Sequence, residues 1–270
     1  MKYTYQYVIN NRYDKNANRV RKIGDTYVIM TVISKALSPV PVYLFLNLGV
    51  HPDTITLASL AFIIASAISF IFGNAILGVV FMLCFALLDS VDGDMARCLG
   101  TTKYGAVLDS FGADLFYALM PVGVGYYLFS IGIATLGLSP VLILLVSVFV
   151  SLSFILYRLI NTKILHFRTS LKESGAEENH SQIAKQALQS NLLVRLLELY
   201  RHVLLRGNFF SEPGMIFWFS VLIFVRRYDL LAWYLVVLLL YNLGYLVTNF
   251  VGMYVFFKSL RQEKMNSPST

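Results

Sequence analysis

Long apolar segments alternate with short polar turns along most of this chain. A helix needs about 20 mostly apolar residues to cross a bilayer, and most of the segments reach that length. They predict six transmembrane helices, over residues 53–73, 75–98, 105–133, 138–165, 212–227 and 230–258, of which the fifth is the shortest. The predicted fold class is therefore all-α, a polytopic membrane protein.

A different pattern precedes the first predicted span. Residues 27–48 are apolar but are interrupted by Lys35, Pro39 and Pro41, and proline inside a helix removes a hydrogen bond and bends it. We interpret this segment as an amphipathic helix at the membrane surface, within a cytoplasmic N-terminal region.

The chain is thereby divided into three parts. These are the N-terminal region 1–52, a six-helix transmembrane domain 53–258 and a cytoplasmic tail 259–270. Within the domain, residues 166–206 form a predicted cytoplasmic loop, and leucines at helical spacing over 191–205 predict a second surface helix there.

Composition and charge agree with this topology. Of the 270 residues, 57% are hydrophobic and 14% charged, and the mean hydropathy is +0.65, which excludes an ordinary soluble domain. Of the 22 Lys and Arg residues, only Arg226 and Arg227 fall on the side opposite to the termini. Positive charge collects on the cytoplasmic side of membrane proteins, so the termini should face the cytoplasm. We separately expect the membrane to be a bacterial or archaeal cytoplasmic membrane. This asymmetry also explains the net charge of +7, and no nucleic-acid partner is expected.

Five aspartates interrupt the second and third predicted spans. They are Asp89, Asp92, Asp94, Asp109 and Asp114. Ionisable residues inside a bilayer are costly and usually functional. At about 100° per residue, Asp89 and Asp92 share one helix face, whereas Asp94 projects off it and is expected to be solvated. Hard divalent cations prefer oxygen ligands, and two metals bridged by carboxylates beside a phosphate-sized gap suit phosphoryl transfer.

The spacing of these residues forms an extended motif. It reads Asp89-x-x-Asp92-Gly93-x-x-Ala96-Arg97, then seven residues, then Gly105-x-x-x-Asp109. This motif resembles the signature of the CDP-alcohol phosphotransferase (CDP-alcohol phosphatidyltransferase) family. The elements His51-Pro52-Asp53-Thr54-Ile55-Thr56 and Lys103-Tyr104-Gly105-Ala106-Val107-Leu108-Asp109 are similar to its phosphatidylinositol-phosphate synthase branch.

The resemblance implies a reaction and its partners. These membrane enzymes transfer a phospho-alcohol from a CDP-linked donor, such as CDP-diacylglycerol, to a small alcohol or phospho-alcohol, and release CMP. The products would be phospholipids or related lipid and surface-glycan precursors. Inositol phosphate, glycerol phosphate, serine and CDP-linked glycan headgroups all fit this reaction. The resemblance also implies a homodimer and contact with membrane lipid.

Specific residues receive roles from the same resemblance. Asp89 and Asp109 would bridge two Mg²⁺ or Mn²⁺ ions, and Asp92 and Asp114 would each bind one of them. The residues expected to contact the nucleotide are Asp53, Thr56, Asp89, Gly93, Ala96, Arg97, Thr102 and Gly105. From its place near the inner end of the fourth span, Arg158 is a candidate to bind an acceptor phosphate, although charge asymmetry accounts for it equally well.

One position departs from the family pattern. The last two aspartates of the family lie one helical turn apart, but position 113 here is alanine and the last aspartate is Asp114. In a regular helix Asp114 would point about 140° away from Asp109. We therefore predict a π turn near Gly112 that restores the shared face, with Asp114 as the base that deprotonates the acceptor. The alternatives are an inactive enzyme or a base supplied elsewhere.

Two other classes of function compete with this hypothesis. A catalytically silent relative, acting as a binding or scaffold protein, would account for the displaced aspartate. A cation transporter would also place carboxylates in the membrane. It would be expected to carry them in several spans, but predicted spans four to six contain no Asp or Glu well inside them.

Overall fold

The computed structural model of the chain describes residues 2–11, 29–100, 103–135, 137–173 and 209–266. Every regular element within these ranges is a helix. The elements are α1 (Tyr5–Asn11), α3 (Ile29–Leu37), α4 (Pro39–Asn47), α5 (Pro52–Ile71), α6 (Ala75–Leu99), α7 (Lys103–Ser130), α8 (Pro140–Glu173), α11 (Glu212–Phe224) and α12 (Tyr228–Asn266). The predicted all-α class is confirmed.

Six helical segments in the described part of the chain are long and apolar enough to cross a membrane, as predicted. They are Ile29–Asn47, Pro52–Ile71, Ala75–Leu99, Val107–Ser130, Pro140–Ile164 and Tyr228–Val251. The number agrees with the prediction, but one member differs. Predicted span 212–227 forms only the 13-residue helix α11, which is about 20 Å long at 1.5 Å per residue. The hydrocarbon core of a bilayer is ~30 Å thick, so α11 cannot cross it alone.

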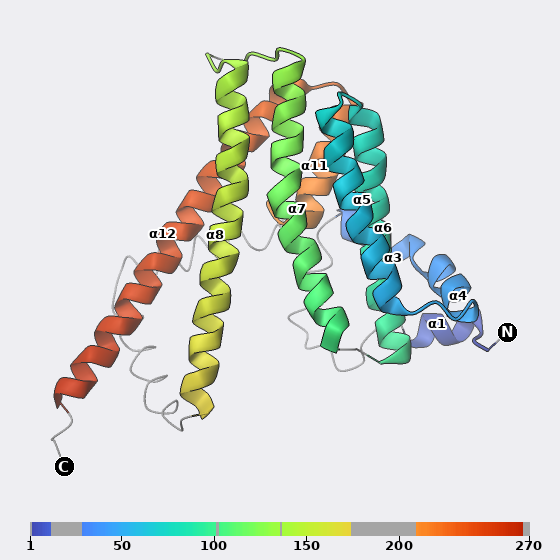
Figure 1. The fold of residues 1–270 in the computed structure, drawn as a ribbon, viewed down its shortest axis with the longest axis horizontal. Helices are drawn as coiled ribbons and strands as arrows, with labels where there is room; N and C mark the ends of the chain where they lie inside the picture. Colours follow the sequence, from blue (N-terminus) through green and yellow to red (C-terminus); the bar gives the residue numbers. More distant parts are fainter. Residues whose placement is uncertain (1, 12–28, 101–102, 136, 174–208, 267–270) are drawn as a thin grey trace.

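The segment predicted to lie at the membrane surface forms two helices. α3 and α4 meet at Ser38, and Pro39 is the first residue of α4, where its missing N–H leaves no partner unsatisfied. α1 packs against α4 and α6 at one end of the bundle (Figure 1). Because Ile29–Asn47 also has the length and composition of a span, its surface position stays a prediction, as do the three domain boundaries.

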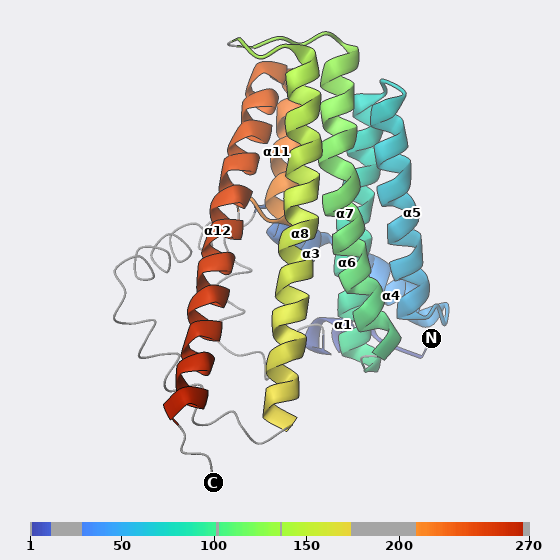
Figure 2. The same ribbon diagram turned by 60° about the vertical axis from the view of Figure 1, so that its left-hand side comes forward.

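The long helices run alternately up and down (Figures 1 and 2). We call the end where α6 stops and α7 starts the site end, and the end where α5 joins α6 the turn end. At the turn end, Gly73 and Gly132 end α5 and α7 with φ of 80° and 70°, a left-handed conformation that glycine adopts readily. α5 packs extensively on both α6 and α7, whose backbones approach each other little.

Aromatic side chains fill the core between α5, α6, α7 and α11. The largest fully buried ones include Phe70, Phe85, Phe116 and Phe219. Phe85 of α6 and Phe116 of α7 stack with 5.7 Å between ring centroids. Large side chains therefore bridge the two helices that carry the aspartates while their backbones stay apart.

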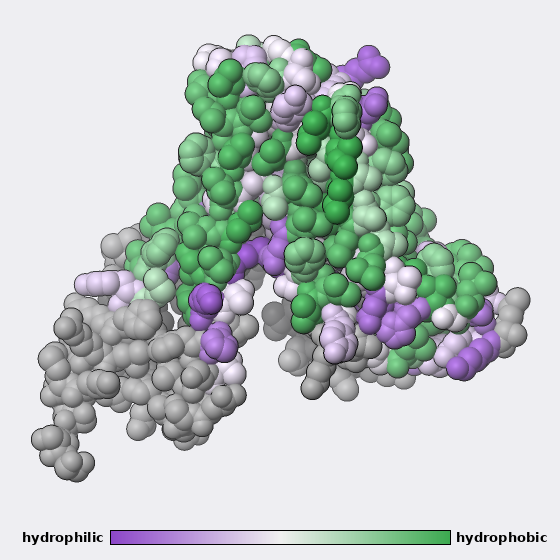
Figure 3. All heavy atoms as spheres, viewed as in Figure 1, coloured by the Kyte–Doolittle hydropathy of each residue, from purple (hydrophilic) through white to green (hydrophobic). Residues whose placement is uncertain are grey.

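α7 and α8 pack closely on one side of the bundle and diverge toward the site end (Figure 1). Where they pack, a Cβ on Gly125 would lie 2.3 Å from the Cβ of Ser147, so the absence of a side chain lets the backbones meet. Figure 3 shows a hollow between the diverging parts, open at the site end and with hydrophilic side chains at its top. α11 begins at about this level (Figure 1).

Two helices extend beyond their predicted ends. α8 continues to Glu173, through the predicted start of the 166–206 loop, and α12 continues to Asn266, into the predicted tail 259–270. The sequence pattern stopped at the last apolar residues, whereas Lys, Glu, Gln and Arg propagate a helix well after them. The predicted surface helix over 191–205 lies outside the described residues.

Candidate active site

Three predicted metal ligands lie near one another toward the site end. Asp89 and Asp92 belong to α6 and Asp109 to α7, and each interacts electrostatically with the other two. Residues three apart share a helix face, and α5 holds α6 and α7 side by side with a space between their backbones. We call these three residues the carboxylate site. The structure thus brings together three of the four predicted ligands.

Asp92 is the most buried member of the carboxylate site, with 4% of its surface exposed. The Thr56 side chain of α5 lies beside its carboxylate, and the Asp92 Oδ2 is buried with no hydrogen-bond partner among the described residues. A buried carboxylate oxygen without a partner is costly. Oxygen atoms in this state are what a hard divalent cation requires as ligands.

The carboxylate site fits the implied metals in chemistry, although it is not closed around them. Within the described ranges, no three His, Cys, Asp or Glu side chains gather closely enough to hold an ion as they stand. Repulsion between like charges keeps carboxylates apart, and a bound cation removes that repulsion. Asp89, Asp92 and Asp109 are therefore the residues that would hold Mg²⁺ or Mn²⁺.

Asp94 is buried, with 3% of its surface exposed, so the prediction of a solvated residue was wrong. Its Oδ2 accepts a hydrogen bond from Ser38 Oγ at 2.6 Å, and its Oδ1 accepts one from Arg97 Nη1 at 2.5 Å. Helical angle alone did not show that α3 and α4 pack against α6. Asp94 therefore fixes Arg97, a predicted nucleotide contact, and ties α6 to the junction of α3 and α4.

The other predicted nucleotide contacts lie on the same elements. The Nδ1 atom of His51 accepts a hydrogen bond from the Asp53 amide at 3.3 Å and caps α5, so Asp53 lies in the first turn of that helix. Thr56 follows one turn later and is buried against Asp92. Gly93 and Ala96 of α6 and Gly105 of α7 are half-buried. Thr102 lies outside the described residues.

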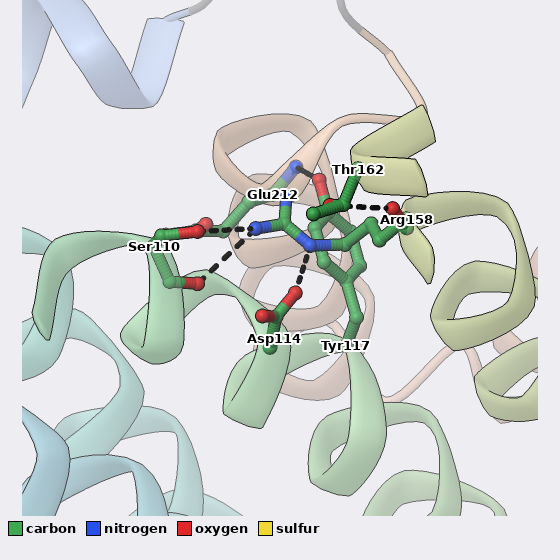
Figure 4. A network of polar contacts seen from close by, with 6 residues as sticks. All are labelled: Ser110, Asp114, Tyr117, Arg158, Thr162 and Glu212. Atoms are coloured by element: carbon green, nitrogen blue, oxygen red, sulfur yellow. Dashed lines mark hydrogen bonds and ion pairs between the residues drawn. The ribbon is translucent and has the colours of Figure 1, made fainter. Parts of the chain in front are cut away.

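The predicted π turn in α7 is wrong, because this helix is α-helical from Lys103 to Ser130. Asp114 is accordingly directed toward α8, where it forms an ion pair with Arg158 Nε (Figure 4). Arg158 Nη2 also donates to the Ser110 carbonyl oxygen at 3.1 Å, and its guanidinium lies 5.7 Å from the centre of the Tyr117 ring. The candidate for an acceptor phosphate and the predicted base are therefore partners of one another.

Glu212 is the site residue that sequence reasoning missed. It is half-buried, begins α11 and lies beside Tyr117 and Arg158 (Figure 4). It interacts electrostatically with Asp89, Asp109 and Arg158. We predicted that spans four to six carry no carboxylate well inside them, and this is corrected by Glu212. Because α11 is too short to reach the site end, its first residue lies within the bundle (Figure 1). The short apolar run of predicted span 212–227 was the feature of the sequence that could have indicated this.

The fold and site together define a polytopic helical membrane protein with a carboxylate site between two of its transmembrane helices. Within that class, the chain belongs to the CDP-alcohol phosphatidyltransferase family, whose model matches residues 49–205, more than half of the chain. This confirms the resemblance inferred from the aspartate motif. Enzymes of this family transfer phospho-alcohol groups and use divalent metal ions.

A similar protein points by its name to the same branch as the motif. A phosphatidylinositol phosphate synthase of Streptomyces avermitilis is 42% identical over 79 residues, 28% of this chain and 32% of that protein. The similarity therefore spans about a third of the relative's length.

Proposed function

We propose that this protein transfers a phosphatidyl-type group from a CDP-linked donor, such as CDP-diacylglycerol, to the hydroxyl of a small alcohol or phospho-alcohol, with release of CMP. The observation that carries the proposal is the carboxylate site. Its three aspartates occur in the family motif, and Asp92 presents a buried oxygen without a partner among the described residues. The named activity of the Streptomyces relative supports the same reaction.

Each part of the carboxylate site has a chemical task in this reaction. Asp89, Asp92 and Asp109 would hold two Mg²⁺ or Mn²⁺ ions, which when bound neutralise the pyrophosphate of the donor and the leaving CMP. Thr56 of α5 lies beside the Asp92 carboxylate, with its hydroxyl donating to the Pro52 carbonyl oxygen at 3.2 Å. Asp94 holds the Arg97 guanidinium at the site end, where it can donate to a phosphate oxygen. Gly93 and Ala96 leave the α6 face without bulk, so the nucleotide can approach the backbone.

The hollow between α7 and α8 suits a donor with one lipid end and one polar end. Its walls are mainly apolar and its top is hydrophilic (Figure 3). Arg158 of α8, which pairs with Asp114 of α7, is the proposed contact for a phosphorylated acceptor. Among the described residues, Arg97 and Lys103 lie at the site end and Arg226 and Arg227 at the turn end. With the charge asymmetry of the sequence, this leads us to assign the site end to the cytoplasm. The protein would then work in a bacterial or archaeal cytoplasmic membrane, as the proposed homodimer.

The proposal is tested by CMP release from purified protein in lipid nanodiscs. CDP-diacylglycerol and a panel of other CDP-alcohols are each incubated with Mg²⁺ and with inositol phosphate, glycerol phosphate, serine or no acceptor. We expect acceptor-dependent CMP release with at least one pair. Asp92→Asn should lower it by at least about a thousandfold, since it removes a metal ligand that acts on the transition state.

Asp229→Asn is the matched control. Asp229 is an exposed carboxylate at the turn end, paired with Arg227 at 2.9 Å, and lies far along the chain from the motif. This variant should retain wild-type CMP release. The absence of CMP with every pair, or equal activity in Asp92→Asn and wild type, contradicts the proposal.

A catalytically silent relative is the second candidate, and one observation favours it. Alanine occupies position 113, and Asp114 is turned toward Arg158 instead of the carboxylate site. A silent relative would bind CDP or a CDP-linked donor but release no CMP from it. Calorimetric titration of the same nanodiscs with CDP, alongside the release assay, separates the two candidates.

A further inference from the structure

We infer that Glu212 is a catalytic residue of this protein, the carboxylate that takes the proton from the acceptor hydroxyl. This inference rests on the proposed function and deepens it. It assigns the missing base to a side chain from a different helix, outside the aspartate motif.

The start of α11 is fixed against α7 by a specific hydrogen bond. The first amides of a helix lack partners within the helix, and the Glu212 amide donates to the hydroxyl of Tyr117 at 2.9 Å. Tyr117 is itself held by Phe154, whose ring stacks on it with 4.3 Å between centroids. The Arg158 guanidinium covers the Tyr117 ring. Glu212 is therefore positioned directly by Tyr117 of α7, which α8 in turn holds in place.

The packing of α11 on α6 and α7 brings Glu212 toward the carboxylate site. At about 100° per residue, Ser110, Asp114 and Tyr117 form one stripe along α7, and Asp109 lies on the neighbouring stripe. α11 packs against α6 as well as α7, so its first residue approaches the helices that carry all three site aspartates. The electrostatic interactions of Glu212 with Asp89 and Asp109 agree with this placement.

The aspartate motif by itself leaves the base position empty. Position 113 is alanine, and the regular helix turns Asp114 to Arg158. Glu212, fixed to α7 through Tyr117, brings a carboxylate from α11 close enough to interact electrostatically with Asp89 and Asp109. The longer side chain of glutamate, compared with aspartate, suits a base that is supplied from a neighbouring helix.

The proposed step balances as follows. The acceptor oxygen forms a bond to the β-phosphorus of the CDP donor while its proton passes to a Glu212 carboxylate oxygen. The bond between the β-phosphorus and the oxygen that bridges to the α-phosphate breaks, and CMP leaves with that electron pair. The phospho-alcohol is thereby joined to the acceptor, and Glu212 afterwards releases its proton to water.

A structural role makes a different prediction. A negative side chain in the first turn of a helix is favourable because the helix N-terminus is partly positive, and this alone could explain Glu212. In that case Glu212→Gln would lower stability slightly but leave the chemical step intact. If Glu212 accepts the proton, Glu212→Gln should instead slow the chemical step and leave stability nearly unchanged.

The test compares Glu212→Gln, Glu212→Ala and Asp114→Asn with wild type in nanodiscs, using the donor and acceptor pair on which wild type is active. CMP release is measured at saturating substrates, and CDP affinity is measured separately by calorimetry. Gln preserves the shape and the backbone amide, so CDP affinity should stay within about threefold. Removing a general base costs about 10² to 10⁴ in rate, so Glu212→Gln should lose at least about a hundredfold. Asp114→Asn should lose less, and Asp229→Asn is again the unchanged control.

Chemical rescue distinguishes the loss of the base from a folding defect. In Glu212→Ala the cavity left by the side chain can admit formate, which should restore part of the CMP release if the missing group is the base. A loss of less than tenfold in Glu212→Gln, a larger loss in Asp114→Asn than in Glu212→Gln, or no rescue by formate overturns the inference. If wild type itself releases no CMP with any pair, the proposed function fails instead.

Discussion

Gly125→Ala should loosen the contact that holds α7 against α8. A Cβ at position 125 would lie 2.0 Å from Ser147 Oγ and 2.3 Å from Ser147 Cβ. The hydroxyl can rotate away, but the Cβ is fixed to the α8 backbone. To reach the 3.4 Å at which ordinary contact begins, the two helices must move apart by about 1.1 Å at this point, against the close packing of a protein interior.

The cost follows from the size of that displacement. Inserting one carbon into a filled interior typically costs about 1–3 kcal/mol, and a clash with backbone-attached carbon belongs at the upper end. Alanine regains about 0.5–1 kcal/mol over glycine in a helix. We expect a net loss of about 2 kcal/mol, measured as the shift in SDS-induced unfolding of the purified protein in mixed micelles, followed by circular dichroism.

Gly123→Ala is the matched control on the same helix. A Cβ there would lie 3.5 Å from the Ala67 Cα and from the Phe70 Cβ, which is ordinary contact. This variant should be neutral or stabilised by up to about 1 kcal/mol, because only the helix propensity changes. Equal stability of Gly125→Ala and wild type, or equal losses in the two variants, refutes the reasoning from close approach.

Three further predictions concern the site. Ser38→Ala removes a hydrogen bond to the buried Asp94 carboxylate and should cost about 1.5–3 kcal/mol in the same unfolding assay. The control Ser153→Ala, which loses only a bond to its own helix, should cost less than about 1 kcal/mol, and equal losses contradict this. Arg158→Gln should raise the KM for a phosphorylated acceptor by about 10- to 100-fold, and an unchanged KM removes Arg158 from the acceptor site. EDTA should abolish CMP release and Mg²⁺ or Mn²⁺ should restore it, so activity that persists in EDTA excludes the metal requirement.

The sequence predicted the long helices well because their signal is local. Spans such as 53–73 and 75–98 agree with α5 and α6 to within about two residues, as expected where an apolar run ends in a polar turn. Of the four aspartates that the motif predicted to share a site, Asp89, Asp92 and Asp109 interact electrostatically, whereas Asp114 pairs with Arg158. The spacing of Asp89 and Asp92 within one helix determined their shared face. Both inferences needed only the period of the helix and the antiparallel pairing of neighbours.

Contacts between elements distant in the chain could not be predicted in this way. The sequence predicted a solvated Asp94 because this residue lies off the face of α6 that carries Asp89. In the structure the packing of α3 and α4 against α6 buries Asp94. We predicted the π turn from the family pattern so that Asp114 would face the other aspartates. In the structure α7 is a regular helix, and Asp114 forms an ion pair with Arg158 instead. Glu212 was overlooked because its depth depends on where α11 starts within the bundle, which no local pattern states.

The hollow between α7 and α8 has a consequence for how rates should be expressed. It lies between the diverging parts of two helices (Figures 1 and 3) whose apolar segments Val107–Ser130 and Pro140–Ile164 are long enough to cross a membrane. A lipid-linked donor can enter such a hollow laterally, with its acyl chains still among neighbouring lipids. The effective concentration of the donor is then its mole fraction among the lipids of the membrane, not its amount per volume of buffer. Adding buffer to the vesicles leaves that quantity unchanged, whereas adding inert lipid lowers it and should slow the proposed reaction in proportion when the donor is well below saturation.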